Sequence, residues 1–507
     1  MNALSFLRRA AGAVSTALFR LLGRHPEGRR LEIAWSVTTR ETMVGVALAA
    51  SPREGAVVAY CRSSTACDRD TLIVQDVVPP IARDLSYHRG PVVTVTSHYW
   101  NRVIDGLAGQ GPDTGLAVLH THPGFGVPMW SSDDDRADDD LARFLFGEGF
   151  LQPEAPLISI VASMTDIRAR VLRFDRTSAI KVSMTPVERI RTLGPSRIQF
   201  ESTTDRLDEG RIHDVPAHAD RSVRVFGREG QRLLADLHIA VVGNGGVGSI
   251  CTEHVARWGI GRISCWDLDI VKDVNVNRSA IITFADAKRK RSKAERLARA
   301  LPAFSLVRDI RVRWSVSDVR DRAEIAHLLS ADIILMLVDD PRPRHFINRL
   351  AYAHYIPVLD GGNAIRSTAE DDPSAEDSMV EAGGIRINYL TPDGPCLWCA
   401  GHLTSERLAL AFRPDYDMAA DRARGYVEGL GPAHAPSVMP VNSLTAALLE
   451  IRLQDLLFGL SNRNVPEVYY DLLGGTLDEL PRLIRSHCPQ CMRWLGLGDG
   501  ADLPFRE

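Results

Sequence analysis

The 507-residue chain lacks a surplus of either charge and lacks long apolar runs. It has 60 Lys and Arg residues against 64 Asp and Glu residues, which gives a formal net charge of −4. Proteins whose main partner is a nucleic-acid backbone rely on a surplus of cationic side chains, so we expect no nucleic-acid partner. A membrane-spanning helix needs about 20 consecutive apolar residues, and the apolar runs here are shorter. We therefore also expect no membrane span.

The composition is otherwise that of an ordinary folded protein, with 45% hydrophobic and 24% charged residues, and its length suggests several domains. Residues 1–30, where arginines interrupt the apolar residues, predict a basic amphipathic segment rather than a secretory signal. Strand-like runs over residues 31–185 predict a first α/β domain. The charged stretch 186–220 predicts a linker. Over residues 221–507 strands alternate with helical patterns, which predicts a second α/β domain with a parallel sheet.

Cysteine is scarce, and half of it is paired. Of eight cysteines, four form two C-x-x-C pairs, Cys396 with Cys399 and Cys488 with Cys491. Two such pairs are typical of one structural zinc ion held by four thiolates. Thiols that are reduced and bound to zinc indicate a cytoplasmic protein. The sequence therefore predicts a four-cysteine zinc site that fastens a long insertion to a larger domain.

A second group of metal-ligating residues lies in the first domain. His120 and His122 follow an apolar run, and residues i and i+2 of a strand project to the same face, so both imidazoles can bind one metal ion. Asp134 offers a third ligand, which leaves a fourth position open, as catalytic zinc requires. Glu41 offers a carboxylate that can move a proton. The alternative is a structural histidine pair beside an acidic helix start.

This series, a distant Glu followed by His-x-His-Pro and Ser-x-x-Asp, resembles the signature of the JAMM (JAB/MPN) metalloproteases. The resemblance implies that His120, His122 and Asp134 bind a catalytic zinc ion, that Glu41 is the general base, and that Ser131 stabilises the oxyanion. It also implies hydrolysis of peptide or isopeptide bonds after the tails of ubiquitin-like proteins. The gap between His122 and Ser131 is one residue longer than the family pattern.

A glycine-rich turn follows a buried-strand pattern at residues 237–242. Glycines let the backbone approach a phosphate closely, and the N-terminus of the next helix favours negative charge. Acidic residues about 20 positions further on suit ribose hydroxyls. This pattern by itself indicates only a nucleotide. The residues concerned are Gly243, Gly245, Gly246, Gly248, Asp267 and Asp269.

The residues on both sides of this turn resemble the ThiF/MoeB and ubiquitin-activating adenylation domain. The matching features are Asn277-Arg278, the helix residue Lys293, the strand-end residue Asp339, and an earlier helix that contains Arg224. The resemblance implies that Arg278 and Lys293 bind ATP and screen its charge, with Asn277 beside them. It implies that Asp339 holds Mg²⁺ and that Arg224 reaches the triphosphate of the partner in a homodimer. The C-x-x-C pairs occur in the same family.

One feature of many family members is missing. Relatives often pass the acyl group to their own cysteine in the loop after an Asp-Gly-Gly strand, here residues 360–362. Neither the following loop, residues 363–380, nor the stretch 400–487 contains a cysteine. We therefore expect the adenylate to pass to a conjugating enzyme or another acceptor in trans.

The combined interpretation is an α/β protein in which a JAMM-type metalloprotease domain precedes a Rossmann-like ThiF adenylation domain with a four-cysteine zinc site. It would activate a ubiquitin-like protein that ends in glycine and cut bonds after its tail. Such fusions resemble those of prokaryotic ubiquitin-like conjugation systems, some linked to antiphage defence. One alternative is a sulfur carrier protein as the substrate. Another is a first domain that only binds tails, and an oxidoreductase is the weakest alternative.

Overall fold

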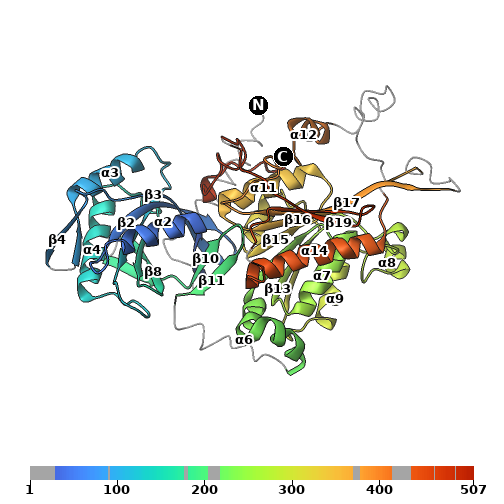
Figure 1. Ribbon diagram of the computed structural model, residues 1–507, viewed down its shortest axis with the longest axis horizontal. Coiled ribbons are helices and arrows are strands. Elements are labelled where there is room, and N and C mark those ends of the chain that lie inside the picture. The colour runs from blue at the N-terminus through green and yellow to red at the C-terminus, as the bar shows by residue number, and fades with distance from the viewer. Residues whose placement is uncertain are drawn as a thin grey trace, which may run out of the picture.

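The computed structural model describes residues 29–89, 92–175, 181–203, 217–368, 377–413, 436–461, 463–485 and 487–506. Two α/β units lie side by side along the long axis of the molecule (Figure 1). The α/β class expected from the sequence is confirmed. The amphipathic segment expected over residues 1–30 lies outside the described residues, apart from Arg29 and Arg30. Among the helices that can be described, none is long and apolar enough to cross a bilayer.

The amino-terminal unit is built on a nine-stranded sheet of order β11-β10-β1-β3-β2-β6-β7-β8-β9. Strands β1, β3, β6, β7 and β10 run in one direction, and β2 runs against its neighbours β3 and β6. The strands are β1 (Arg30–Ser36), β2 (Ala56–Thr65), β3 (Arg69–Val78), β6 (Gly115–Thr121), β7 (Leu157–Ala162), β8 (Ile167–Asp175), β9 (Lys181–Pro186), β10 (Arg189–Leu193) and β11 (Ile198–Ser202). The strands β4 (Leu85–Arg89) and β5 (Val92–Val95) form a separate hairpin.

Helices cover both faces of this sheet because its strands are apolar on both sides. In β2, Val57 and Ala59 pack in the core beneath α2 (Val37–Leu48), whereas Val58 and Tyr60 pack beneath α3 (Ser97–Leu107) and α4 (Ser132–Gly147). This alternation follows from the two-residue period of a strand.

The expected linker over residues 186–220 differs in the structure. Its first part forms β10 and β11, because β10 pairs in parallel with β1 and β11 pairs with β10. All five residues of β10 are buried although it contains two arginines. The two arginines of β10 are therefore buried in the sheet and are not part of a solvated connector. Residues 204–216 lie outside the described residues.

The carboxy-terminal unit has an eight-stranded sheet of order β14-β13-β12-β15-β16-β17-β18-β19. Its first five strands are parallel and the last three pairings are antiparallel. The strands are β12 (His238–Val242), β13 (Arg262–Trp266), β14 (Arg311–Ser315), β15 (Ile333–Met336), β16 (Val358–Ser367), β17 (Val380–Leu390), β18 (Glu467–Asp471) and β19 (Thr476–Leu480).

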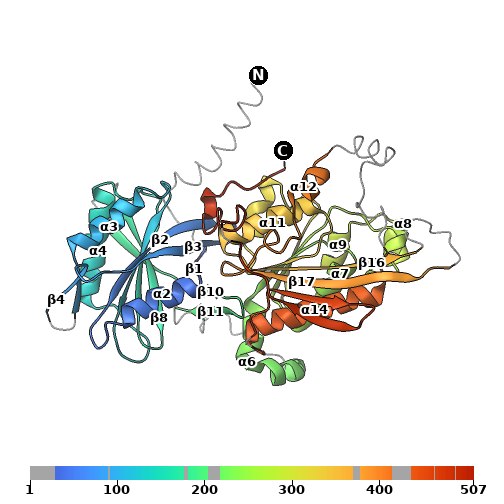
Figure 2. The same cartoon turned by 45° about the horizontal axis from the view of Figure 1, so that its top comes forward.

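Helices pack on both faces of this second sheet, as in doubly wound folds. Buried residues of α7, α9 and α14 share one core with the sheet, and those of α11 share another (Figures 1 and 2). The helices are α6 (Asp220–Asp236), α7 (Gly246–Trp258), α8 (Phe284–Lys288), α9 (Lys293–Ala300), α10 (Ile325–Leu328), α11 (Pro341–His354), α12 (Ser405–Ala411) and α14 (Met439–Phe458). Short 3-10 turns η1 to η5 lie at 217–219, 273–275, 301–303, 322–324 and 498–500.

Candidate functional sites

The histidine pair and Asp134 come together at the end of β6. His120 Nε2 lies 3.3 Å from Asp134 Oδ1, and His122 Nε2 lies 3.5 Å from Asp134 Oδ2. The two imidazole rings are 5.1 Å apart between centroids. One ligand atom from each of the three residues lies within 4.8 Å of the others. The strand end supplies both imidazoles and the first turn of α4 supplies the carboxylate.

A capping box fixes the Asp134 carboxylate. Ser131, the N-cap of α4, accepts a hydrogen bond from the Asp134 amide at 3.2 Å and donates its hydroxyl to Asp134 Oδ2 at 2.8 Å. Burial alone would raise the pKa of Asp134, but the His120 imidazole and the hydrogen bonds from Ser131 hold that pKa well below its usual range. Asp134 is therefore ionised and oriented. The predicted role of Ser131 at the oxyanion stays a prediction, because in this structure its hydroxyl serves the helix cap.

This arrangement fits a zinc ion. His120 Nε2 is buried and has no hydrogen-bond partner among the described residues, since its contact with Asp134 lacks hydrogen-bond geometry. A buried polar atom without a partner is costly unless a ligand completes it. Two imidazoles and one carboxylate are a known donor set for catalytic zinc, with the fourth position left for water or substrate.

Glu54, and not Glu41, is the carboxylate beside this group. Glu41 lies on the exposed face of α2. Glu54 precedes β2, in which Ala56 pairs with His120, and its Oε1 lies 4.0 Å from His122 Nε2. The expectation for Glu41 is therefore corrected. The sequence held a signal for Glu54, since it directly precedes the apolar run that forms the strand next to the histidines.

The β4–β5 hairpin holds Glu54 in place. The Val93 amide donates to Glu54 Oε2 at 3.2 Å, and the Tyr87 hydroxyl donates to the Glu54 backbone oxygen at 3.0 Å. Glu54 Oε1 stays directed to His122. The loop that follows His122 exposes Phe125, whose exposed fraction is 86%, and Met129, at 61%. The site is therefore open to solvent and has apolar side chains at its edge.

Arg170 is a supporting residue that the sequence analysis missed. Its guanidinium forms ion pairs at 2.6 Å with both Asp135 and Asp138 of α4 and stacks under Trp130, 4.5 Å from the ring centroid. Two members of the acidic run thus fasten the start of α4 to β8. Because α4 carries Asp134, this contact positions the third ligand.

In the second unit, a cavity of about 770 Å³ opens at the carboxyl ends of β12, β13 and β15. This is where doubly wound sheets bind ligands. Most of the residues expected at a nucleotide site line it. They are Gly243, Gly245, Gly246, Asp267, Asp269, Arg278, Lys293 and Asp339.

The glycine-rich turn is shaped for close backbone approach. Gly243 has φ +91°, and a Cβ there would lie 2.6 Å from the Leu337 backbone oxygen. Gly248 is not part of the cavity wall, and a Cβ there would lie 1.8 Å from the Gly243 backbone oxygen, so it lets α7 pack closely on the turn. The N-terminus of α7 begins at Gly246 and faces the cavity, which favours an anionic group.

Two aspartates and Lys293 also line the cavity. Asp267 accepts backbone hydrogen bonds from Asn244 at 2.6 Å and from Asp269 at 2.8 Å. Burial nevertheless raises the pKa of Asp267, with Lys293 opposing that rise. Lys293 Nζ donates to Asp269 Oδ2 at 2.7 Å. The lysine is buried at the start of α9 and lines the cavity, so it can neutralise negative charge there.

Two expected residues lie away from the cavity wall. Asn277 is exposed and does not line it, whereas Asn275 caps the turn η2 by accepting a hydrogen bond from the Lys272 amide. Arg224 is exposed and pairs with Asp220 on its own helix α6. Its predicted action across a homodimer stays a prediction.

Three residues that sequence reasoning missed also face the cavity. Asn442 of α14 donates to the Arg278 backbone oxygen at 3.1 Å. Arg344 of α11 pairs with Asp360 at 2.6 Å, and both side chains line the wall. Asn442 and Arg344 lie 164 and 66 positions beyond Arg278 in the chain, so no local pattern connects them to the turn.

The four paired cysteines form one buried cluster. Sγ atoms lie 3.7 Å apart for Cys396–Cys399, 3.8 Å for Cys396–Cys488 and 3.7 Å for Cys399–Cys491. Four thiolates at the corners of a tetrahedron, each about 2.3 Å from zinc, lie about 3.8 Å apart. The cluster therefore has the dimensions of a structural zinc site, and it joins the segment before α12 to the end of the chain.

Comparison with known proteins bears on the second unit. Residues 219–425 match the ThiF family. The chain is 28% identical over 187 residues to the molybdopterin-synthase adenylyltransferase of Escherichia coli (strain K12), which covers 36% of this chain and 66% of that protein. It is 24% identical over 271 residues to the SAMP-activating enzyme E1 of Haloferax volcanii, which covers 52% of this chain and 84% of that protein.

The chain spans less than half the length of the sulfur carrier protein ThiS adenylyltransferase of Bacillus subtilis (strain 168), matching 46% of that protein and 34% of this chain at 27% identity. The solved structure of E. coli MccB with ATP aligns with 54% of this chain and 74% of its own, at 16% identity and a TM-score of 0.39. The family match and the sequence relatives agree on the second unit. The carboxy-terminal half of the chain is therefore similar to the ThiF family, and its relatives include adenylyltransferases and an E1-type activating enzyme.

Proposed function

We propose that the chain activates a ubiquitin-like protein at one site and cuts bonds after its tail at the other. The observation that carries the first activity is the cavity in which Lys293, Arg278 and Asp339 meet the glycine-rich turn. The observation that carries the second is the convergence of His120, His122 and Asp134 with Glu54 beside them.

The adenylation step follows from ordinary carboxylate chemistry. A carboxylate is a poor electrophile at neutral pH. An oxygen of the terminal glycine carboxylate attacks the α-phosphorus of ATP, the bond to pyrophosphate breaks, and an acyl-adenylate forms. The protein supplies position and charge. Arg278 and Lys293 line the cavity and would face the phosphates, and the α7 N-terminus would add backbone N–H groups.

Asp339 would hold magnesium at the strand end after β15. A magnesium ion bound there screens the phosphate charge. Arg344, paired with Asp360, also lines the cavity and would meet either the pyrophosphate or the tail carboxylate.

The described cysteines favour an acceptor in trans. Cys251 and Cys265 are buried on α7 and β13, and burial raises the pKa of Cys265 to about 12. Burial raises the pKa of Cys61 as well. Cys67 is exposed, but it lies at the amino end of β3, where its amide donates to Ala326 of α10. None of these thiols lines the nucleotide cavity.

The tail-cutting step uses the amino-terminal site. A zinc ion held by the three ligands lowers the pKa of water and polarises a carbonyl group when bound. Glu54 would take the proton from the attacking water and return it to the leaving amine. Ser131 and Arg170 would keep Asp134 oriented through the cap and through α4. The exposed side chains of Phe125 and Met129 would contact the substrate residues next to the cleaved bond.

ATP–pyrophosphate exchange tests the first activity. A panel of small proteins ending in glycine, ubiquitin-like and sulfur carrier proteins included, is mixed with the chain, ATP and labelled pyrophosphate. We expect exchange with one class and none with a carrier that lacks its last glycine. Absence of exchange across the whole panel would contradict the proposal.

A sulfur carrier as the substrate is the second candidate. It is favoured by the relatives, two of which are named for the sulfur carrier ThiS and for molybdopterin synthase. The final acceptor decides between the two. Transfer to lysine through a conjugating enzyme indicates protein conjugation, whereas a thiocarboxylate at the tail indicates sulfur transfer.

Zinc content tests whether the amino-terminal site binds metal or only tails. We expect two zinc ions per chain, one lost in His120→Ala and the other in Cys488→Ser. One ion per chain, present in His120→Ala, would indicate a non-catalytic first domain.

We also propose a homodimer, supported by Ile451 and Val438 exposed on and beside α14, and a cytoplasmic location, supported by the reduced cysteine cluster. Light scattering measures the first and fractionation the second.

A further inference from the structure

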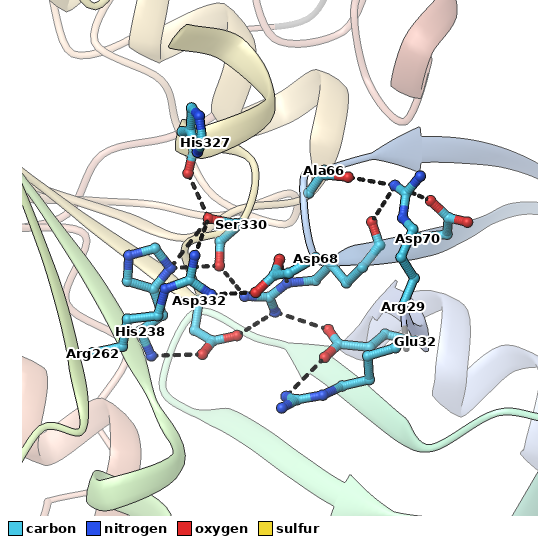
Figure 3. A network of polar contacts seen from close by, with 12 residues as sticks. Arg29, Glu32, Ala66, Asp68, Asp70, His238, Arg262, His327, Ser330 and Asp332 are labelled. Carbon is cyan, nitrogen blue, oxygen red and sulfur yellow. Dashed lines mark hydrogen bonds and ion pairs between the residues drawn. The ribbon is translucent and has the colours of Figure 1, made fainter. Parts of the chain in front are cut away.

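A buried network of ion pairs joins the two units. Arg69 Nη1 forms hydrogen bonds with Glu32 Oε2 at 3.0 Å and with Asp332 Oδ1 at 2.5 Å. Figure 3 labels the two carboxylates, Glu32 and Asp332, within this network. Arg189 bridges the same two carboxylates. Asp332 belongs to the second unit, where its other oxygen accepts a hydrogen bond from the His238 amide at 2.8 Å. The network therefore crosses the boundary between the units.

The network also fixes how the two sheets face each other. Arg69 and Arg189 are the first residues of β3 and β10, and Glu32 lies near the start of β1. On the other side His238 is the first residue of β12 and Asp332 directly precedes β15. The two sheets are thus joined through the amino ends of their parallel strands.

The junction is buried and held by many contacts between the two units. Glu32 and Asp332 are 0% and 1% exposed. Arg69 and Arg189 hold the pKa of Asp332 well below its usual range despite burial. Further contacts flank the network, with Ser64 Oγ 2.8 Å from His354 Nδ1 and Thr65 bonded to Asp499. Apolar residues of both units also share one buried cluster.

Each candidate site lies at the opposite, carboxyl edge of its own sheet. Strand β6 runs parallel to β3, so the histidine pair at its end lies away from Arg69. Along β3 the path runs from Arg69 to Val74, which pairs with Cys61 of β2. Cys61 pairs in turn with Gly115 of β6, and the path continues along β6 to His120. At about 3.3 Å per residue this path runs roughly 33 Å along the strands. On the other side the glycine-rich turn lies roughly 16 Å along β12 from His238.

From this topology we infer that the two sites act on separate tails. One chain can hold two carrier tails at once, and a tail that is cut at the first site reaches the second only after it leaves the chain. Glu54 contacts the β4–β5 hairpin, whereas Gly246 and Lys293, which line the nucleotide cavity, begin α7 and α9. Strand β4 lies at one end of the molecule, and α7 and α9 lie in the other unit (Figures 1 and 2). An extended tail would need roughly a dozen or more residues to span both strand lengths. The inference rests on the proposed function for its substrate and on the network for its geometry.

Spin labels test the geometry without any substrate. Cys67→Ser removes the exposed thiol, and the other cysteines are buried. Phe125→Cys and Leu268→Cys then place one label at each site, because both side chains are exposed. Labelled chains are diluted with unlabelled chains so that only distances within one chain are measured. We expect one narrow distance distribution beyond about 40 Å. A broad distribution, or one centred below about 25 Å, would overturn the inference.

Label dilution tests the release step with the carrier that supports pyrophosphate exchange. An unlabelled carrier with extra residues after its last glycine is mixed with an excess of mature isotope-labelled carrier, and the adenylate is analysed by mass. We expect the labelled share of the adenylate to equal the labelled share of the mature pool. Enrichment of the unlabelled form would show internal transfer and contradict the inference. If the extended carrier is never cut, the proposed hydrolase fails, and the spin-label distance still decides the geometry.

Discussion

The two candidate sites differ in how the chain assembles them. The candidate metal ligands of the amino-terminal site come from a short stretch of chain, His120 to Asp134, and lie at an open surface. The nucleotide cavity gathers residues from Gly243 to Asn442 around the ends of parallel strands. A local site depends on one strand end and one helix cap, whereas a distributed site depends on the whole sheet. A substitution at the first site should therefore disturb only the few residues near it. A substitution in the second sheet should disturb several residues of the cavity at once.

The strongest expected contrast is between two glutamates of the first unit. Glu54→Gln should lower tail cleavage by about 10² to 10⁴-fold, because a positioned general base contributes about that much. Glu41→Gln, on the exposed face of α2, is the matched control and should keep the cleavage rate. Both variants should bind zinc and keep pyrophosphate exchange. An equal loss of tail cleavage in both variants would show that the position of Glu54 beside His122 does not identify the general base.

The second contrast concerns the distributed site. Lys293→Ala should lower pyrophosphate exchange by about 10² to 10³-fold, a typical loss for one positioned group that stabilises developing charge. Tail cleavage should not change, because the other site lies beyond the junction. Lys288→Ala, an exposed lysine of the same basic run, is the control and should retain exchange. Exchange that survives Lys293→Ala would remove this lysine from the site.

The third prediction breaks the connection between the two units. Asp332→Asn should lower the free energy of unfolding by about 3 kcal/mol, since removing one partner leaves buried charges uncompensated. Denaturant titration measures this loss. Asp340→Asn changes a partly exposed aspartate of the same unit and should cost much less. If Asp332→Asn has no effect, the network does not hold the two units together.

The smallest expected effect is a dependence of stability on pH. Arg189 and Arg69 outweigh burial and lower the pKa of Glu32 from its ordinary value of 4.5 to about 2. Because the folded pKa is depressed, the contribution of Glu32 is present above about pH 4.5 and is lost as the pH falls toward 2. Thermal melting measured across this range should show a steeper decline for the native chain than for Glu32→Gln. Parallel curves would contradict the assignment.

The sequence predicted the local part of each site. The spacing of His120, His122 and Asp134 and of the two C-x-x-C pairs placed their side chains correctly together, because strand and turn geometry relate nearby residues. It failed for Glu54, since the choice between two glutamates depends on which strand pairs with β6. It also failed for the 186–202 region, because arginines that pair with buried carboxylates look like solvated charge in a sequence.

The sequence by itself determined the α/β class, the residue types of the two candidate metal sites and the glycine-rich turn, because these follow from residue type and short spacing. Only the tertiary structure decided that Asn442, Arg344 and Asp360 line the cavity. It also decided that the two sheets meet through Asp332 at their amino ends. The physical reason is that strand order and domain docking depend on burial and charge pairing between residues far apart in the chain.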